Sequence, residues 1–146
     1  MAYRFPLVTL LRFRENLEHR SWLELQAANQ QVQRAEVSIS QLERERVEWR
    51  TGRLSALDIG VKAAELEVWG ESYYQRKRLE FERCRLTAKQ QAAAKLAEFY
   101  RARQKRQVLE NLYLRGKNAY DTERARREQA RVDELFLLRR GRIASS

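Results

Sequence analysis

The side chains that most often carry catalysis or bind metal ions are scarce in this sequence. Its 146 residues include one histidine, His19, and one cysteine, Cys84. A lone histidine cannot supply the His clusters of metal sites, and a lone cysteine cannot close an intramolecular disulfide. We therefore expect no catalytic residue, no cofactor-binding residue and no metal site, and we expect Cys84 to be a reduced thiol on a helix.

The richest cluster of polar groups is "RREQARVDEL", residues 126–135, which mixes three arginines with four acidic or amide side chains. Such a stretch could be a nucleic-acid arm, a solvated helix face or a surface for another protein. The formal charge is +10, and residues 61–146 hold 21 Lys and Arg against 12 Asp and Glu, whereas residues 1–60 hold nine against eight. DNA or RNA is one acidic partner that this excess would suit. Acids interleave with the arginines at helical spacing, however, as Glu123 does with Arg127, and this pattern favours a self-paired, solvated face over a nucleic-acid site.

The composition indicates long helices. The chain has one proline and five glycines, and 34% of its residues are charged, which is typical of coiled coils. No segment approaches the roughly 18 apolar residues that a membrane span requires, and the apolar start of the chain is too short for a signal peptide. We expect a soluble, cytoplasmic protein.

A seven-residue repeat of apolar side chains predicts the first helix, over about residues 6–50. Two rows repeat at this interval and form the a and d positions of a coiled coil: Leu25, Val32 and Ile39, and Ala28, Ala35, Leu42 and Trp49. Towards the N-terminus, Leu17, Phe13 and Leu10 continue this stripe only through a stutter at Ser21. Pro6 suits the first turn of the helix.

The glycine-containing stretch at 51–61 predicts the turn. Gly52 and Gly60 could end a helix, and Ser55 or Asp58 could cap the next one. An alternative turn at Gly70 has no other helix breaker beside it. The second helix is expected over about 62–140, and its expected apolar row repeats at seven-residue intervals: Leu79, Leu86, Ala93 and Tyr100.

The two expected helices differ in length. A first helix of about 40 residues is about 60 Å long, and an antiparallel partner of equal length ends near Ala102. Residues 103–140 would then overhang with an uncovered apolar stripe, which usually marks a partner surface: Val108, Leu109, Leu112, Tyr113, Tyr120, Leu135 and Phe136. The expected fold is all-α, a single domain (1–146) that forms a long antiparallel two-helix coiled-coil hairpin with a longer, protruding C-terminal helix.

Both ends of the chain resemble the FliJ family, the soluble coiled-coil component of the bacterial flagellar protein-export apparatus, a type III secretion system. The N-terminal residues that match the family pattern are Phe5, Leu7, Leu10, Leu11 and Arg14. The C-terminal ones are Leu109, Glu110, Leu112, Tyr120, Glu123, Glu128, Gln129, Asp133, Glu134 and Leu135. The sequence departs from the pattern at Gly116, Phe136 and Leu138, where helix-favouring or smaller residues are expected.

This resemblance implies a function without catalysis. FliJ-like proteins are similar to the stalk of rotary ATPases; they associate with the hexameric export ATPase, FliI, and its regulator, FliH, engage the membrane export gate protein FlhA and escort export chaperones. The resemblance implies a cytoplasmic protein associated peripherally with the inner membrane. It assigns the ATPase contact to Leu109, Leu112, Glu128, Gln129, Asp133 and Glu134. The alternatives are a solvated helix end for the four polar residues, an injectisome stalk protein of the same architecture, and a basic nucleic-acid-binding coiled coil.

A second candidate site follows the expected turn. Trp69, Tyr73 and Tyr74 place three large amphipathic rings close together, and such rings often anchor protein interfaces. The resemblance assigns this region to the export gate. The alternative is packing between the helices for Trp69 and Tyr73. The adjacent Tyr73 and Tyr74 point about 100° apart, so they cannot both face the partner helix.

Overall fold

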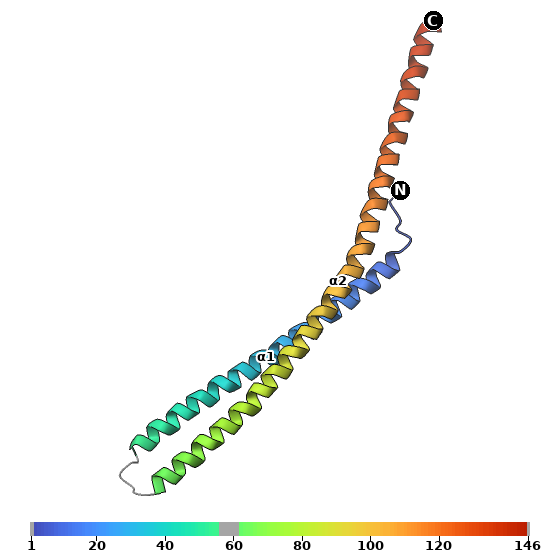
Figure 1. Cartoon of the computed structure of the whole chain (residues 1–146). Helices are drawn as coiled ribbons and strands as arrows, with labels where there is room; N and C mark the ends of the chain where they lie inside the picture. The colour runs from blue at the N-terminus through green and yellow to red at the C-terminus, as the bar shows by residue number, and fades with distance from the viewer. Residues whose placement is uncertain (1, 56–61, 146) are drawn as a thin grey trace. The chain divides into compact units, whose positions relative to one another are not determined.

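The computed structural model describes residues 2–55 and 62–145, and all of its regular secondary structure is helical. Helix α1 is Val8–Ser55 and helix α2 is Lys62–Ser145, and the two pack against each other (Figure 1). Gly52 lies inside α1, so it does not end the first helix as expected, and Ser55 is the last residue of α1 instead of a cap. Asp58 and Gly60, the other expected turn residues, lie outside the described residues.

The chain divides into two compact units. The terminal unit consists of residues up to Glu18 together with those from Ala102 onwards, and the central unit is His19–Arg101. Each unit therefore contains one piece of α1 and one piece of α2.

The expected inward face of α1 is confirmed in the central unit. Leu25 and Leu42 are buried, and the other members of the two predicted rows are half-buried: Ala28, Val32, Ala35, Ile39 and Trp49. Residues at this spacing stay on one side of a helix, and in the central unit that side of α1 is the buried one.

The predicted stutter at the start of α1 is wrong beyond Leu17, which is half-buried as expected. Leu10 and Phe13 are exposed, whereas Leu11, Arg14 and Glu18 are half-buried. The seven-residue spacing therefore continues unbroken from Leu11 through Glu18 to Leu25. Charged side chains at the inward positions concealed this register in the sequence.

The predicted apolar row of α2 is also wrong. Leu79, Leu86, Ala93 and Tyr100 are all exposed. In the central unit the buried and half-buried residues repeat at the same interval but five residues earlier: Tyr74, Phe81, Ala88 and Lys95. A lysine in this row, and the Leu residues outside it, explain why hydrophobicity alone selects the wrong face.

Ion pairs connect α1 to α2 along the central unit. Glu24 pairs with Lys95 at 3.2 Å, Glu36 with Arg85 at 3.8 Å and Glu43 with Arg78 at 3.0 Å. Arg46 and Arg50 both pair with Glu71, at 2.7 and 2.8 Å. The partner's number on α2 falls as the residue number on α1 rises. These pairs are partly exposed, so each stabilises the fold only weakly and they act mainly on register.

Gly70 provides a notch for an aromatic ring and is not a turn. It is buried within α2, and a Cβ atom added to it would lie 2.5 Å from Cη2 and 2.7 Å from Cε2 of Trp49. Only a residue without a side chain lets the indole approach the α2 backbone this closely.

The N-terminal segment covers part of α2 within the terminal unit. The Phe5 ring packs edge-on against Tyr113, with centroids 5.5 Å apart, and Tyr3 lies between Tyr113 and Tyr120 at 5.8 and 5.6 Å. Gly116 is a second notch, because a Cβ there would lie 2.9 Å from Cζ of Tyr3. The end of the Tyr3 side chain therefore lies where a side chain at position 116 would project.

Candidate protein-binding surfaces

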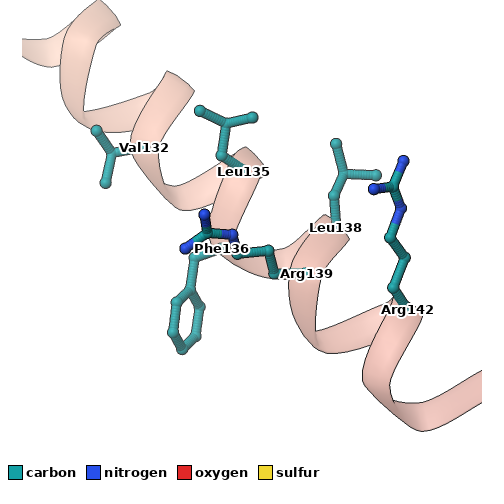
Figure 2. A pocket seen from close by; sticks show the side chains of 6 residues that line it. All are labelled: Val132, Leu135, Phe136, Leu138, Arg139 and Arg142. Carbon is teal, nitrogen blue, oxygen red and sulfur yellow. The ribbon is translucent and has the colours of Figure 1, made fainter.

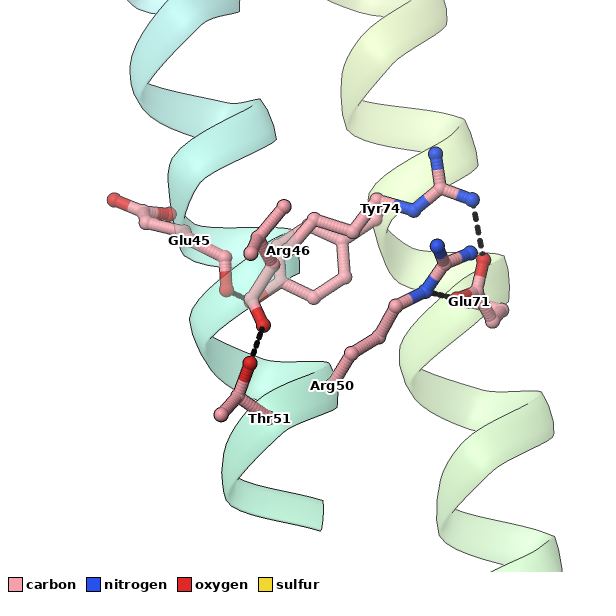
Figure 3. A network of polar contacts seen from close by, with 7 residues as sticks. Glu45, Arg46, Arg50, Thr51, Glu71 and Tyr74 are labelled. Atoms are coloured by element: carbon pink, nitrogen blue, oxygen red, sulfur yellow. Dashed lines mark hydrogen bonds and ion pairs between the residues drawn. The ribbon is translucent and has the colours of Figure 1, made fainter. Parts of the chain in front are cut away.

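A polar network fastens the two helices near their connected ends (Figure 3). Glu71 of α2 accepts hydrogen bonds from Nε of Arg50 and Nη2 of Arg46, both on α1. These two hydrogen bonds, from Arg50 first and then Arg46, hold the pKa of the Glu71 carboxyl below its ordinary value. The carboxylate stays charged at neutral pH, and the network fixes which turns of the two helices face each other.

Tyr74 belongs to this internal packing and not to an exposed aromatic site. Its ring centroid lies 5.9 Å from that of Trp49, and its hydroxyl donates to the carbonyl oxygen of Glu45 at 3.5 Å. Burial, more than the nearby carboxylates, raises the pKa of the Tyr74 hydroxyl. The structure thus removes Tyr74 from the candidate gate surface.

Trp69 and Tyr73 are exposed on the same helix. The Trp69 side chain is 73% exposed and that of Tyr73 is 44% exposed. Packing between the helices, the alternative for this pair, is therefore wrong for Trp69. Tyr73 is more than half covered and lines a hollow together with Leu42 of α1. The expectation that Tyr73 and Tyr74 face different surroundings is confirmed, and Trp69 and Tyr73 remain as the candidate aromatic surface.

The candidate ATPase residue Leu109 is buried, which corrects its assignment to an uncovered surface. It is only 8% exposed and follows the inward spacing of α2 in the terminal unit, with Tyr113 and Gly116 as the next inward positions. The expectation took the first helix to be about 40 residues long, whereas α1 has 48 residues. In the terminal unit α1 also pairs Glu18 with Arg106, one turn before Leu109. Leu112 is 44% exposed and stays a candidate.

The polar candidates in "RREQARVDEL" are exposed, and three of the four pair with a residue of the same helix. The amide of Gln129 donates to Asp133 at 3.0 Å, and Glu128 pairs with Arg124 at 3.4 Å. The expected pair of Glu123 and Arg127 is present at 3.5 Å. Glu134 forms no hydrogen bond or ion pair with another of the described residues.

The last turns of α2 expose an apolar surface that the sequence analysis identified only in part. Every residue from 124 to 145 is exposed. Figure 2 shows the side chains that line a hollow on this segment: Val132, Leu135, Phe136, Leu138, Arg139 and Arg142. Of these, Leu135 and Phe136 were expected in an uncovered stripe. The sequence does signal Leu138, Arg139 and Arg142, through a run of four apolar residues followed by three arginines without an acid. Val132 lies before this run.

Within residues 2–55 and 62–145, no three His, Cys, Asp or Glu side chains gather as they would around a metal ion. Cys84 is an exposed free thiol. Neither described helix contains a stretch apolar and long enough to cross a membrane.

Comparison with known proteins gives no relative: no protein-family model, no curated protein and no solved structure matches the chain.

Proposed function

We propose that this chain is a FliJ-like, non-enzymatic component of the bacterial flagellar protein-export apparatus. In this role it binds the export ATPase, FliI, together with its regulator, FliH, and promotes the assembly of the ATPase ring. It also engages the export gate protein FlhA and escorts export chaperones. It acts in the cytoplasm and reaches the inner membrane only by peripheral association.

The proposed architecture is an antiparallel coiled-coil hairpin whose longer second helix protrudes at the C-terminal end. The falling order of ion-pair partners, from Glu24 with Lys95 to Arg46 with Glu71, supports opposite helix directions in the central unit. Inward residues at seven-residue intervals in both helices support coiled-coil packing. A hairpin of this kind suits a stalk because its uncovered end is a single helix that a ring can surround.

The observation that carries the proposal is the exposed apolar surface at the end of α2. Six of its side chains are 58–77% exposed: Val132, Leu135, Phe136, Leu137, Leu138 and Ile143. Four of these are consecutive, and successive residues of a helix point about 100° apart, so apolar groups surround most of the helix. Apolar surface of this extent usually marks a protein interface, and a partner that covers it must contact the helix from several sides.

The polar pairing of the preceding turns favours a protein partner over nucleic acid. Arg124, Arg126 and Arg127 each lie within 3.5 Å of a carboxylate on their own helix. Phosphate contacts would have to compete with these carboxylates. The distinction between a flagellar and an injectisome stalk depends on the two terminal motifs.

The proposed gate surface consists of Trp69 and Tyr73, without Tyr74. Two exposed rings at i and i+4 lie on one face of a helix, and aromatic residues of this kind contribute strongly to interfaces. Tyr74, which packs against Trp49, serves instead to hold the helix that presents them.

The test is hydrolysis of ATP by the matching purified export ATPase with and without this chain. We expect the chain alone to be inactive and to raise the rate of the ATPase. Replacing Leu135 and Phe136 with Ala removes apolar area from the contact, at a cost of about 2 kcal/mol of binding free energy, and should shift the stimulation to much higher chain concentration. Gln129→Ala and Glu134→Ala should have smaller effects, about 1 kcal/mol each.

Leu23→Ala is the matched control, since Leu23 is 51% exposed but lies on α1, which carries none of the candidate ATPase residues. It should leave stimulation unchanged. If the chain fails to stimulate the ATPase, or if the double variant at 135 and 136 stimulates as well as the parent, the proposed function is wrong.

A further inference from the structure

The row of apolar residues that the sequence analysis assigned to the helix interface forms a continuous stripe on the outer face of α2. We call Leu79, Leu86, Ala93, Leu96 and Tyr100 the outer stripe. All five are exposed, Leu79 and Leu86 by about three-fifths. The stripe lies wholly within the central unit.

The outer stripe keeps a constant angle from the inner face along its length. Each residue of the row Leu79, Leu86, Ala93 and Tyr100 follows an inward residue, such as Tyr74 or Ala88, by five positions. Five positions at about 100° each put the row about 140° from the inward one. Since both rows repeat every seven residues, the stripe does not wind around into the interface. A second helix could pack along it by the same geometry that joins α1 to α2.

The charges beside the outer stripe have mostly one sign. The positions three or four residues from the row at 79, 86, 93 and 100 hold four cations: Arg76, Arg83, Lys89 and Arg103. They hold one acid, Glu82, and its carboxylate pairs with Arg85 at 3.5 Å. Arg76, Arg83 and Lys89 form no ion pair with another of the described residues. An apolar row with uncompensated cations along its edges selects an acidic partner.

We propose that the outer stripe is a docking surface for an acidic amphipathic helix of another protein. The helix would place apolar residues at seven-residue spacing on the stripe and carboxylates opposite Arg76, Arg83 and Lys89. A second copy of this chain fits less well, because its own stripe would bring the same cations face to face. A nucleic acid would gain nothing from the apolar row. The inference does not rest on the export role, because it concerns another surface and another partner.

The probe is a synthetic peptide with Leu at a and d positions and Glu at e and g positions, labelled for fluorescence anisotropy and titrated with the full chain at physiological salt. Such a peptide repels itself at neutral pH and so offers its apolar face to a basic partner. We expect binding at micromolar chain, and no binding of a peptide with Lys in place of Glu. A third peptide, with the Glu residues kept and Ser in place of Leu, should also fail to bind.

Two variants locate the contact. Leu86→Gln and Lys89→Glu should each weaken binding of the acidic peptide about tenfold, and Lys89→Glu should also bring measurable binding of the Lys peptide. Their controls, Leu23→Gln on an exposed part of α1 and Lys105→Glu away from the stripe, should change neither. Circular dichroism should show unchanged helicity, because the replaced side chains are exposed.

Three results would overturn the inference. The first is that neither charged peptide binds, and the second is that the acidic peptide binds equally to the Leu86→Gln variant. The third is a dimer in sedimentation that Leu86→Gln dissociates, which would assign the stripe to a second copy. The inference would be supported if the acidic peptide binds the parent chain and both controls but binds the two stripe variants more weakly. This outcome does not depend on whether the chain stimulates an ATPase.

Discussion

Two successive stretches of α2, residues 102–123 and 124–145, have similar lengths but opposite relations to the rest of the terminal unit. In the first, one residue in every three or four is buried or half-buried, and Leu109 and Tyr113 lie at these positions. In the second, every residue is exposed, although it contains the densest apolar run of the chain. The comparison shows that the location of apolar residues does not by itself identify the core. A covering segment is needed as well, and only the first stretch has one.

The largest expected effect is on the free energy of unfolding, and it differs between alanine variants in the two stretches. Leu109→Ala should lower the free energy of unfolding by about 2–4 kcal/mol, because it deletes a buried side chain and leaves a cavity. Leu135→Ala should change it by less than about 0.5 kcal/mol, because that side chain is already exposed. Urea unfolding followed by circular dichroism measures both. Equal losses for the two variants would mean that residues 124–145 are covered too.

The two glycines that an aromatic ring approaches closely, Gly70 and Gly116, should respond differently to replacement by alanine. Gly70→Ala should destabilise the chain by about 1–2 kcal/mol, because the new methyl group meets the indole of Trp49, a bulky ring in the helix interface. Gly116→Ala should be near neutral, since the group it meets is the end of the Tyr3 side chain, which can turn aside, and alanine favours the helix by about 1 kcal/mol. Thermal unfolding of the two variants tests this ranking, and a stabilised Gly70→Ala protein would contradict the notch.

These particular residues also show how much of the molecule could be predicted. The all-helical class and the inward face of α1 followed from composition and from the repeat that includes Leu25 and Leu42. The inward face of α2 could not be found in the same way. Lys95 lies on this face because its ammonium group pairs with the carboxylate of Glu24 on α1. Gly70 lies on it because the Trp49 ring fills the space that a side chain at position 70 would occupy. In both cases the cause is a residue of α1, so the sequence of α2 around the position does not reveal it.

The candidate site residues are likewise either exposed or covered according to whether another segment packs on them. Exposure of Trp69, Phe136 and the polar residues near 129 agrees with a role in binding. Leu109 and Tyr74 were misassigned because the residues packed on that part of α2, which include Glu18 beside Arg106 and Trp49 beside Tyr74, are distant in sequence. A pattern along one helix indicates which residues share a face, but the residues that cover that face decide whether it remains free.

A smaller effect is expected from pH, at the network of the central unit. Because Arg50 and Arg46 lower the pKa of Glu71 in the folded chain, their contribution to stability is complete above the unfolded carboxyl pKa of about 4.3. It is lost as the pH falls through the lower folded value. Glu71→Gln should therefore be less stable than the parent at pH 7, and the difference should shrink below about pH 4. A difference that stays constant from pH 7 to acid would show that the carboxylate charge contributes nothing.

The most direct test of the central claim is hydrogen exchange along α2, with and without the matching export ATPase. In the free chain, amides of residues 124–145 should exchange faster than those of 102–123, because an uncovered helix opens more readily than a packed one. When the ATPase is added, protection should rise most in 124–145 and less in 102–123, where Leu112 is the one exposed candidate contact. Protection confined to other parts of the chain, or none at all, would contradict the account of this helix end as the ATPase contact.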